Sequence, residues 1–273
     1  TNYRLDPNQL WMGAGTGIFE DRSSEVGVRG TNVSGAFGHS IGGVSGDIDN
    51  DGGIDLFISN LAHPRYMKFS DLSMVLLNQG NPEFKFFNMF ENSGIKYEET
   101  VSDPLLFDAD NDGDLDLYFT SIYRGRQSFL YRNDGSGHFT DISWQSGARV
   151  ANGWGVAAAD YDLDGHTDIL VASADGIRLL RNQGNGNHWL SIRHQSQACN
   201  RFGVGNRVTI SYAGAKQVRY VSAGKGTGTQ NSLALQFGLG SHEGSVKVES
   251  VDLCGGVIEL DLGSGNRHII IRN

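Results

Sequence analysis

The fold of this chain follows from the stretch Asp108-Ala109-Asp110-Asn111-Asp112-Gly113-Asp114-Leu115-Asp116, whose pattern occurs three times. The other copies begin at Asp47 and Asp160, and all three have the form D-x-D-x-D-G-x-x-D. Carboxylates packed this closely repel one another unless a cation lies among them. Calcium is a hard cation that takes six to eight oxygen ligands in flexible geometry. The pattern therefore predicts about three calcium ions, one in each loop.

Each position of the loop has its own role in this prediction. Aspartates at positions 1, 3 and 5 turn toward one centre, and glycine at position 6 supplies the sharp turn. Position 7 contributes its backbone carbonyl, and the aspartate at position 9 closes the shell. The expected ligands are Asp47, Asp49, Asp51, Gly53 and Asp55; Asp108, Asp110, Asp112, Asp114 and Asp116; and Asp160, Asp162, Asp164, His166 and Asp168, with Gly53, Asp114 and His166 acting through their carbonyls.

The residues after each loop exclude an EF-hand. That motif requires a glutamate at position 12 and flanking helices. Position 12 is Ile58, Phe119 or Val171 here, each within a run of β-branched or aromatic residues. Such runs favour strands, so the pattern predicts calcium loops on β-hairpins. Three acidic turns without a metal are the alternative, since Asp and Gly are common turn formers.

The loops recur as parts of a longer repeat. They begin at residues 47, 108 and 160, and each lies between two short apolar segments that are followed by an Asn/Gly turn. About four short strands in 50 to 60 residues is typical of one β-propeller blade. Residues 10–19 resemble the tail of a preceding repeat. Since propellers have about four to eight blades, three explanations stay open: further blades upstream, unusual closure, or completion by a partner chain.

The pattern changes after Asn187 to alternation of apolar and polar residues, as in half-buried strands. These runs are 188–194, 208–212, 217–221, 246–251 and 268–271. We therefore predict an all-β protein: propeller blades over 1–186, with three complete calcium-loop units and a leading partial one, and a small β-sandwich or barrel over 187–273.

Composition limits the partners and the location of the protein. The net charge of −9 argues against binding to nucleic acid, which requires a basic surface. No apolar run is long enough for a membrane span. Thr1 looks like a mature or trimmed end, so location is argued from calcium, which is abundant outside cells. We expect a secreted, extracellular or cell-surface protein, with the bacterial periplasm as an alternative.

The two cysteines, Cys199 and Cys254, allow two interpretations. An oxidising compartment would permit a disulfide between them. They could equally be two small, buried core residues.

The three loops, with Phe37-Gly38 and Trp154-Gly155 before two of them, resemble FG-GAP/VCBS repeats, the calcium-bearing blades also found in integrin α-subunit heads. The tail resembles the ASPIC/UnbV domain, which follows such repeats in bacterial secreted proteins. The residues that carry the second resemblance are 187–190, 200–201, 203–205, 217–219, 230 and 237–240. Both resemblances imply a calcium-bearing all-β protein, without specifying its molecular role.

Three functions are compatible with these features. The first is a non-catalytic extracellular interaction, adhesion or self-assembly protein that binds another protein, a glycan or copies of itself. The second is a polysaccharide-active lyase or hydrolase on a calcium-stabilised propeller. The third is a structural protein that forms filaments by edge-to-edge pairing of blades or strands. We favour the first, because the chain has three metal-loop patterns and no H-E-x-x-H motif.

Overall fold

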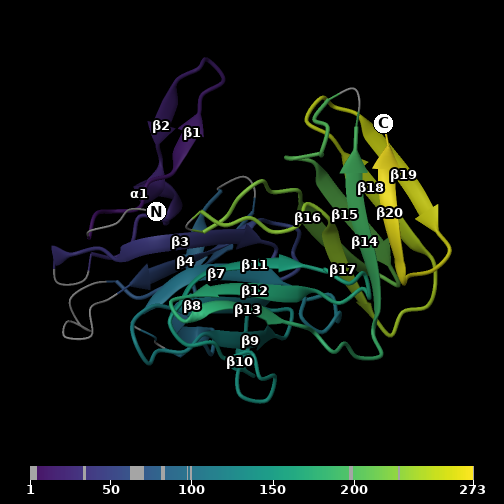
Figure 1. The fold of residues 1–273 in the computed structure, drawn as a ribbon. Helices are drawn as coiled ribbons and strands as arrows, with labels where there is room; N and C mark the ends of the chain where they lie inside the picture. Colours follow the sequence, from purple (N-terminus) through teal and green to yellow (C-terminus); the bar gives the residue numbers. More distant parts are fainter. Residues whose placement is uncertain are drawn as a thin grey trace.

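The computed structural model describes residues 5–32, 35–61, 71–80, 84–96, 98, 100–196, 199–226 and 228–272. It consists of mainly antiparallel sheets with a sandwich at one end (Figure 1). Helical structure within these ranges includes α1 (Ser23–Val26) and a 3-10 turn (Phe90–Asn92). The prediction of an all-β fold built from FG-GAP-type blades is confirmed.

Each acidic loop joins the first two strands of one blade. In every blade the aspartate at position 9 is the first residue of the second strand. The first blade has the order β3 (His39–Gly46), β4 (Asp55–Leu61), β5 (Met74–Asn78), β6 (Phe86–Asn88); the second has β7 (Val101–Phe107), β8 (Asp116–Ser121), β9 (Phe129–Asn133), β10 (Phe139–Asp141); the third has β11 (Gly153–Ala159), β12 (Asp168–Ser173), β13 (Gly176–Leu180).

The blades are stacked face to face, and apolar side chains fill the space between them. Phe57 of the first blade packs against Phe119 of the second in one buried cluster. Tyr118, on the opposite face of the second blade, packs in another cluster with Ile169 and Val171 of the third. Both faces of the second blade are therefore buried, which explains the nearly continuous apolar runs after the loops.

The third blade differs from the prediction of four strands per unit, because it has three. After β13 the chain does not turn back to form an outer strand. Instead, Asn185 Nδ2 donates to the Asp110 carbonyl at 2.5 Å, and Asn187 Nδ2 donates to the same carbonyl at 2.9 Å. These bonds tie the segment after β13 to the second acidic loop and lead it toward the C-terminal sheets.

The leading partial repeat is a two-stranded hairpin of β1 (Trp11–Gly13) and β2 (Phe19–Asp21). Ser23 binds Asp21 in the same way as Ser143 binds Asp141 at the outer edge of the second blade. The hairpin therefore matches the outer half of a blade. Over the described residues, the sheets do not close into a propeller ring.

The C-terminal sheets form a sandwich, one of the two predicted forms. Side chains of both sheets, including Ile192, Ile210 and Phe237, share one buried core. One sheet has the order β17 (Leu235–Gly240), β14 (His188–Gln195), β20 (Arg267–Arg272), and the other has β16 (Ala215–Tyr220), β15 (Arg207–Tyr212), β18 (Val246–Val251), β19 (Val257–Leu262). The pairing of β14 with β20 is parallel, while the other pairs are antiparallel.

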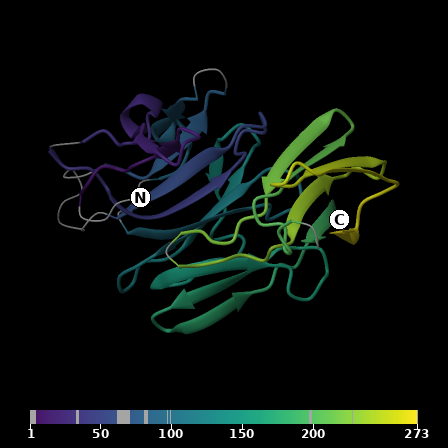
Figure 2. The same cartoon turned by 90° about the horizontal axis from the view of Figure 1, so that it is seen from above.

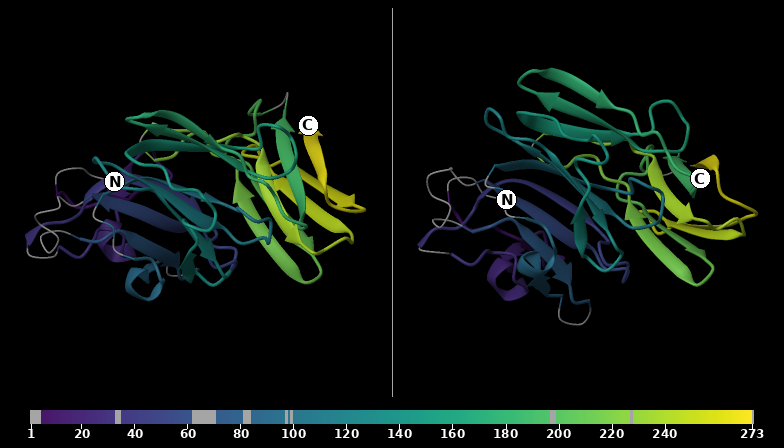
Figure 3. Two further views of the ribbon diagram at one scale, coloured as in Figure 1. Left: turned by 60° about the horizontal axis from the view of Figure 1, so that its bottom comes forward. Right: turned by 90° about the horizontal axis from the view of Figure 1, so that it is seen from below.

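The segment between β16 and β17 fastens the sandwich to the blades. It extends over their first strands, as the view from above shows (Figure 2). The Gly226 N–H donates to the Gly43 carbonyl of β3 at 3.1 Å, and the Ser232 N–H donates to the Ala158 carbonyl of β11 at 2.9 Å. In both views of Figure 3 the sandwich lies at one end of the stacked blades. The domain boundary between residues 186 and 187 stays a prediction, because the segment between β16 and β17 also connects the sandwich to the blades.

Candidate metal centres

Each acidic loop brings three carboxylates together. Their ligand oxygens lie within 4.8 Å of one another. Calcium–oxygen distances are about 2.3–2.6 Å, so two oxygens on one ion are at most about 5.2 Å apart. The three groups, drawn from positions 1, 3 and 9, are Asp47, Asp49 and Asp55; Asp108, Asp110 and Asp116; and Asp160, Asp162 and Asp168.

The carboxylate at position 9 also closes the loop. Asp116 Oδ2 accepts the Ala109 N–H at 2.8 Å, and its Oδ1 accepts the Asn133 N–H at 2.9 Å. Asp55 makes the equivalent pair of bonds in the first blade, and Asp168 in the third. This residue thus joins the start of the loop to the third strand of its own blade, whether or not a metal is bound.

The aspartate at position 5 makes a turn contact within its own loop. Asp51, Asp112 and Asp164 are not in the three carboxylate groups. Their Oδ1 atoms accept the N–H of position 7, at 2.6, 2.9 and 2.9 Å respectively. These bonds are turn contacts, which leave the second carboxylate oxygen for other partners. Coordination by this position, and by the carbonyls of position 7, stays a prediction.

The glycine at position 6 makes the turn as predicted. Gly52, Gly113 and Gly165 have φ values of +90°, +107° and +90°. In the second loop the Gly113 N–H donates to Asp108 Oδ2 at 3.0 Å. The left-handed backbone thus directs an amide at the carboxylate of position 1, and only glycine adopts this conformation without strain.

The carboxylates are costly to bury without a cation. Burial raises the pKa of Asp47 to about 6 and the pKa values of Asp55 and Asp108 to about 7. Burial, with the charge of Asp108 as the second cause, raises the pKa of Asp116 well above its usual range. A bound divalent cation would favour the ionised form of all of these groups.

The second loop contains a buried carboxylate oxygen that a metal ion would complete. Asp108 is 2% exposed, and its Oδ1 atom has no hydrogen-bond partner among the described residues. An unpaired buried carboxylate oxygen is unfavourable unless a ligand completes it. The loop donors identified are carboxylate oxygens, which suit calcium better than a soft transition metal. The residues therefore fit calcium.

The third loop is more open and has a cation of its own. Arg181 Nε lies 2.6 Å from Asp162 Oδ2, and Arg181 Nη2 lies 3.1 Å from Asp164 Oδ2. Asp162 is one of the three carboxylates grouped in this loop. The guanidinium offsets part of the negative charge, so we expect weaker calcium binding in the third loop than in the second.

Asparagine side chains link the loops to one another. Asn133 Nδ2 donates to the Ile48 carbonyl at 2.7 Å, which joins the second blade to the first loop. Asn50 Nδ2 donates to Asp114 Oδ1 at 2.7 Å, and Asn111 Nδ2 donates to the Gly165 carbonyl at 3.1 Å. These contacts were not predicted from the sequence. Their signal is the recurrence of asparagine at the end of the third strand, as Asn78, Asn133 and Asn182.

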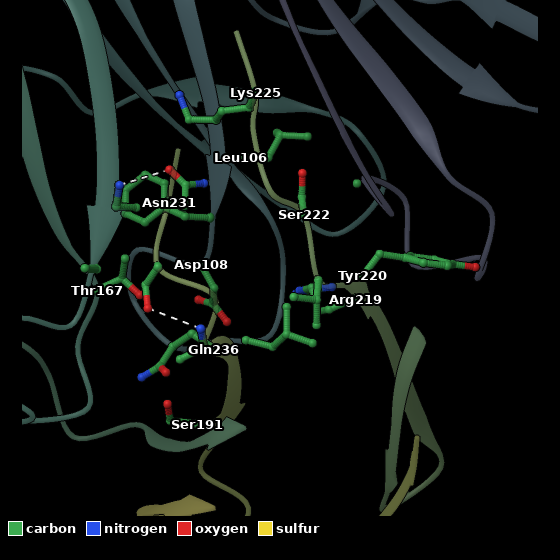
Figure 4. Close-up of a pocket in the computed structure, with 18 of the residues that line it drawn as sticks. Leu106, Asp108, Thr167, Ser191, Arg219, Tyr220, Ser222, Lys225, Asn231 and Gln236 are labelled. Atoms are coloured by element: carbon green, nitrogen blue, oxygen red, sulfur yellow. Dashed lines mark hydrogen bonds between the residues drawn. The ribbon is translucent and has the colours of Figure 1, made fainter. Parts of the chain in front are cut away.

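A cavity of about 1000 Å³ lies between the first strands of the blades and the sandwich. Figure 4 shows Asp108, Arg219 and Gln236 around it, with Lys225 at its far end. Lys225 Nζ is engaged with Asp103 Oδ2 at 3.3 Å and with the Val156 carbonyl at 2.8 Å. The roles of Lys225 and Arg219 were not predicted from the sequence, because no local pattern identifies a residue whose side chain contacts a distant part of the fold.

Cys199 and Cys254 form a disulfide, with their Cα atoms 6.2 Å apart. The bridge ties the segment after β14 to the turn between β18 and β19. The first interpretation of these two cysteines, a disulfide, is therefore the one that the structure supports. None of the described helices is long and apolar enough to span a membrane.

Comparison with known families defines the class of protein. Residues 108–171 match the FG-GAP-like repeat, and residues 196–251 match the family described as ASPIC and UnbV. The chain therefore carries FG-GAP-like repeats followed by an ASPIC/UnbV domain, as its motifs predicted.

Particular relatives have the same order of domains. The chain is 24% identical to human cartilage acidic protein 1 over 97% of its own length, and 24% identical to the mouse protein over 88%. It spans 40% and 37% of the length of these two relatives. A solved Ca²⁺-stabilised, ice-binding adhesin of an Antarctic bacterium matches 86% of this chain and 67% of its own chain, at 12% identity and a TM-score of 0.16, which is too low to support an argument.

Proposed function

We propose that this chain is a calcium-binding, non-catalytic interaction module of the extracellular space. Calcium in the acidic loops fixes the blades relative to one another, and the assembled surface binds a protein or glycan ligand. The observation that carries the proposal is the group of three carboxylates in each loop, with the unpartnered Asp108 Oδ1 in the second. The disulfide and the similarity to cartilage acidic protein 1 support a secreted location.

Calcium acts here through protein stability. The loops offer their clustered carboxylates only when the blade hairpins are folded, so an ion that binds them stabilises the folded chain by mass action. The residues that would hold it are the three carboxylates of each group. The aspartate at position 5 makes a turn contact, and Asn50 and Asn111 link their loops to the next loop.

Thermal unfolding tests this proposal. We expect the melting temperature to fall by more than about 5 °C when millimolar calcium is replaced by EGTA, and to recover when calcium is restored. Magnesium at the same concentration should restore less, because it requires a tighter octahedral shell. An unchanged melting temperature in EGTA would show that calcium is not structural.

Self-assembly is a second candidate, favoured by the free face of the third blade. Leu170, Ile177 and Leu179 are 44%, 68% and 50% exposed on one face of its sheet. Leu170 follows position 9 by two residues, as do Phe57 and Tyr118, which are buried against the next blade. We propose a second copy of this chain as the occupant, since the same type of face is covered by a sheet in both other blades.

Sedimentation at several protein concentrations tests this assembly. We expect wild-type protein to self-associate and a variant with L170T, I177T and L179T to remain monomeric, because threonine keeps the strand propensity but removes the apolar face. L253T is the matched control, since Leu253 is 68% exposed in a turn of the sandwich. A wild-type protein that stays monomeric at high concentration would exclude this second candidate.

A further inference from the structure

The second acidic loop is a contact point of the C-terminal sandwich. The Gly238 N–H of β17 donates to Asp108 Oδ2 at 3.0 Å, and the Gly240 N–H donates to the Asn111 carbonyl at 2.8 Å. From β16, Arg219 Nη2 donates to the Gly113 carbonyl at 3.1 Å. Over the part of the chain that the structure describes, the first loop has no such bond to the sandwich; its outside contacts are with the second blade.

The close approach at Gly238 depends on the absence of a side chain. A Cβ atom there would lie 2.2 Å from Asp108 Oδ2 and 2.3 Å from the Asn111 backbone carbon. Both distances are far below van der Waals contact. The sandwich therefore reaches the loop only because residue 238 is glycine and only while Asp108 keeps its position.

The two oxygens of Asp108 have different partners. Oδ2 accepts N–H groups from Gly113 of the same loop and from Gly238 of the sandwich, both at 3.0 Å. Oδ1 has no hydrogen-bond partner among the described residues. The Asp108 carboxylate thus accepts a hydrogen bond from the sandwich with one oxygen and leaves the other oxygen for an ion. Docking of the sandwich and calcium binding therefore depend on the same orientation of this side chain.

Arg219 brings positive charge from the sandwich to the loops. It is 8% exposed, stacks 5.6 Å from the Phe237 ring and interacts electrostatically with Asp108 and Asp47. A buried guanidinium requires negative charge nearby. The second loop has five aspartates, so one guanidinium leaves it strongly negative and leaves charge for an ion.

The third loop meets the sandwich too. Gln236 Nε2 donates to the Gly165 carbonyl at 2.8 Å, and His268 Nε2 lies 3.8 Å from Asp160 Oδ2. The first aspartates of two loops therefore both lie at the interface, whereas Asp47 of the first loop reaches it only through its charge on Arg219.

We propose that calcium in the second loop and docking of the sandwich are coupled: the ion fixes the Asp108 carboxylate that receives the Gly238 N–H, and the docked sandwich in turn raises calcium affinity. This inference rests on the proposed calcium function. Because such coupling is reciprocal, docking raises calcium affinity by the same factor by which calcium favours docking, so loss of the docked state must weaken calcium binding.

Calorimetric titration with calcium, combined with amide hydrogen exchange on the full chain, tests the coupling. In G238A the added methyl group should displace β17 from the loop. We expect one class of calcium sites to weaken by about fivefold or more, and the amides of 238–240 to lose their calcium-dependent protection. G263A is the matched control, because a Cβ at Gly263 has no atom within 4 Å, and it should behave as wild type.

A second pair of variants keeps the test decisive if G238A does not fold. D110N and D49N change the same position of the second and first loops. D110N should abolish the calcium-dependent protection of 238–240, while D49N should leave it intact. The coupling is wrong if wild type binds calcium but protection of these amides is equal in EGTA, or if G238A binds calcium like wild type. Failure of wild type to bind calcium at all would overturn the proposed function itself.

Discussion

At the scale of single residues, the buried aspartates decide how the protein responds to its solution. Asp55 and Asp108 are almost completely buried and receive backbone N–H groups. Burial still outweighs these bonds and raises the pKa of both groups to about 7, from an ordinary value of 3.8. Without calcium, the folded chain therefore holds protons that the unfolded chain releases at lower pH.

This difference predicts opposite effects of pH with and without calcium. Calcium-free protein should lose stability as pH rises from about 4 to about 7, because the unfolded state releases its protons first over that range. Calcium binding requires ionised carboxylates, so the stabilisation by calcium should increase over the same range. Melting curves at pH 5, 6, 7 and 8, with and without calcium, measure both. A calcium effect independent of pH would contradict the prediction.

Among the asparagines that link the loops, Asn133 is the one whose replacement should lower the free energy of unfolding the most. It is 2% exposed, and its Nδ2 donates to the Ile48 and Leu115 carbonyls. N133A leaves both acceptors without this donor, and we expect a loss of about 2–4 kcal/mol in the free energy of unfolding. Urea denaturation measures it, with R132A at the exposed neighbouring position as the control. Equal midpoints for the two variants would show that the link is not structural.

At the scale of elements, each blade is a hairpin closed by its loop and completed by its neighbours. The first and second blades have four strands, and the third ends after β13 because Asn185 and Asn187 of its next segment are bound to the second loop. In the sandwich, the disulfide performs a similar function, since it joins the segment after β14 to the β18–β19 turn.

The disulfide should contribute strongly to the stability of the sandwich. Cys199 and Cys254 are 55 positions apart, and closing a loop of that size restricts the unfolded chain by about 4 kcal/mol in the chain-entropy model. The variant C199S/C254S should therefore show a lower denaturation midpoint than wild type. Reducing agent should shift wild type toward the variant and leave the variant unchanged. A reductant effect on the variant would point to a cause other than this bond.

At the scale of the whole molecule, a buried ion pair joins the sandwich to the blades. Lys225 Nζ lies 3.3 Å from Asp103 Oδ2, and their side chains are 6% and 0% exposed. Asp103 Oδ2 also accepts from the Val156 N–H and the Thr229 hydroxyl. The pair thus lies at the point where the segment after β16 crosses the first strands.

Removing the charge of Lys225 alone should lower the free energy of unfolding much more than neutralising both Lys225 and Asp103. K225M leaves Asp103 buried and without its counter-charge, and we expect a loss of about 3–5 kcal/mol in the free energy of unfolding. The double variant K225M/D103N should recover part of this loss, because asparagine can still accept from Val156 and Thr229. Chemical denaturation measures both, with K216M at an exposed site of β16 as control. A double variant less stable than K225M would contradict this account.

The sequence alone determined the parts of this protein that depend on local chemistry. The nine-residue pattern fixes the loops, because its glycine and aspartates act within one turn, and the apolar runs on either side fix the strands. The alternation of apolar and polar residues after Asn187 fixes a second β region in the same way. The expectation of a fourth strand in the third unit was wrong, because bonds from Asn185 and Asn187 to the second loop direct the chain away.

Only the tertiary structure decided how these parts join. The pairing of Lys225 with Asp103, the contact of Gly238 with Asp108 and the bridge between the cysteines connect positions 55 to 130 residues apart. No local pattern encodes such contacts, and a glycine needed for close approach has the same letter as one needed for a turn. The physical reason is that these contacts depend on how folded parts pack, a geometry that exists only after the local elements have formed.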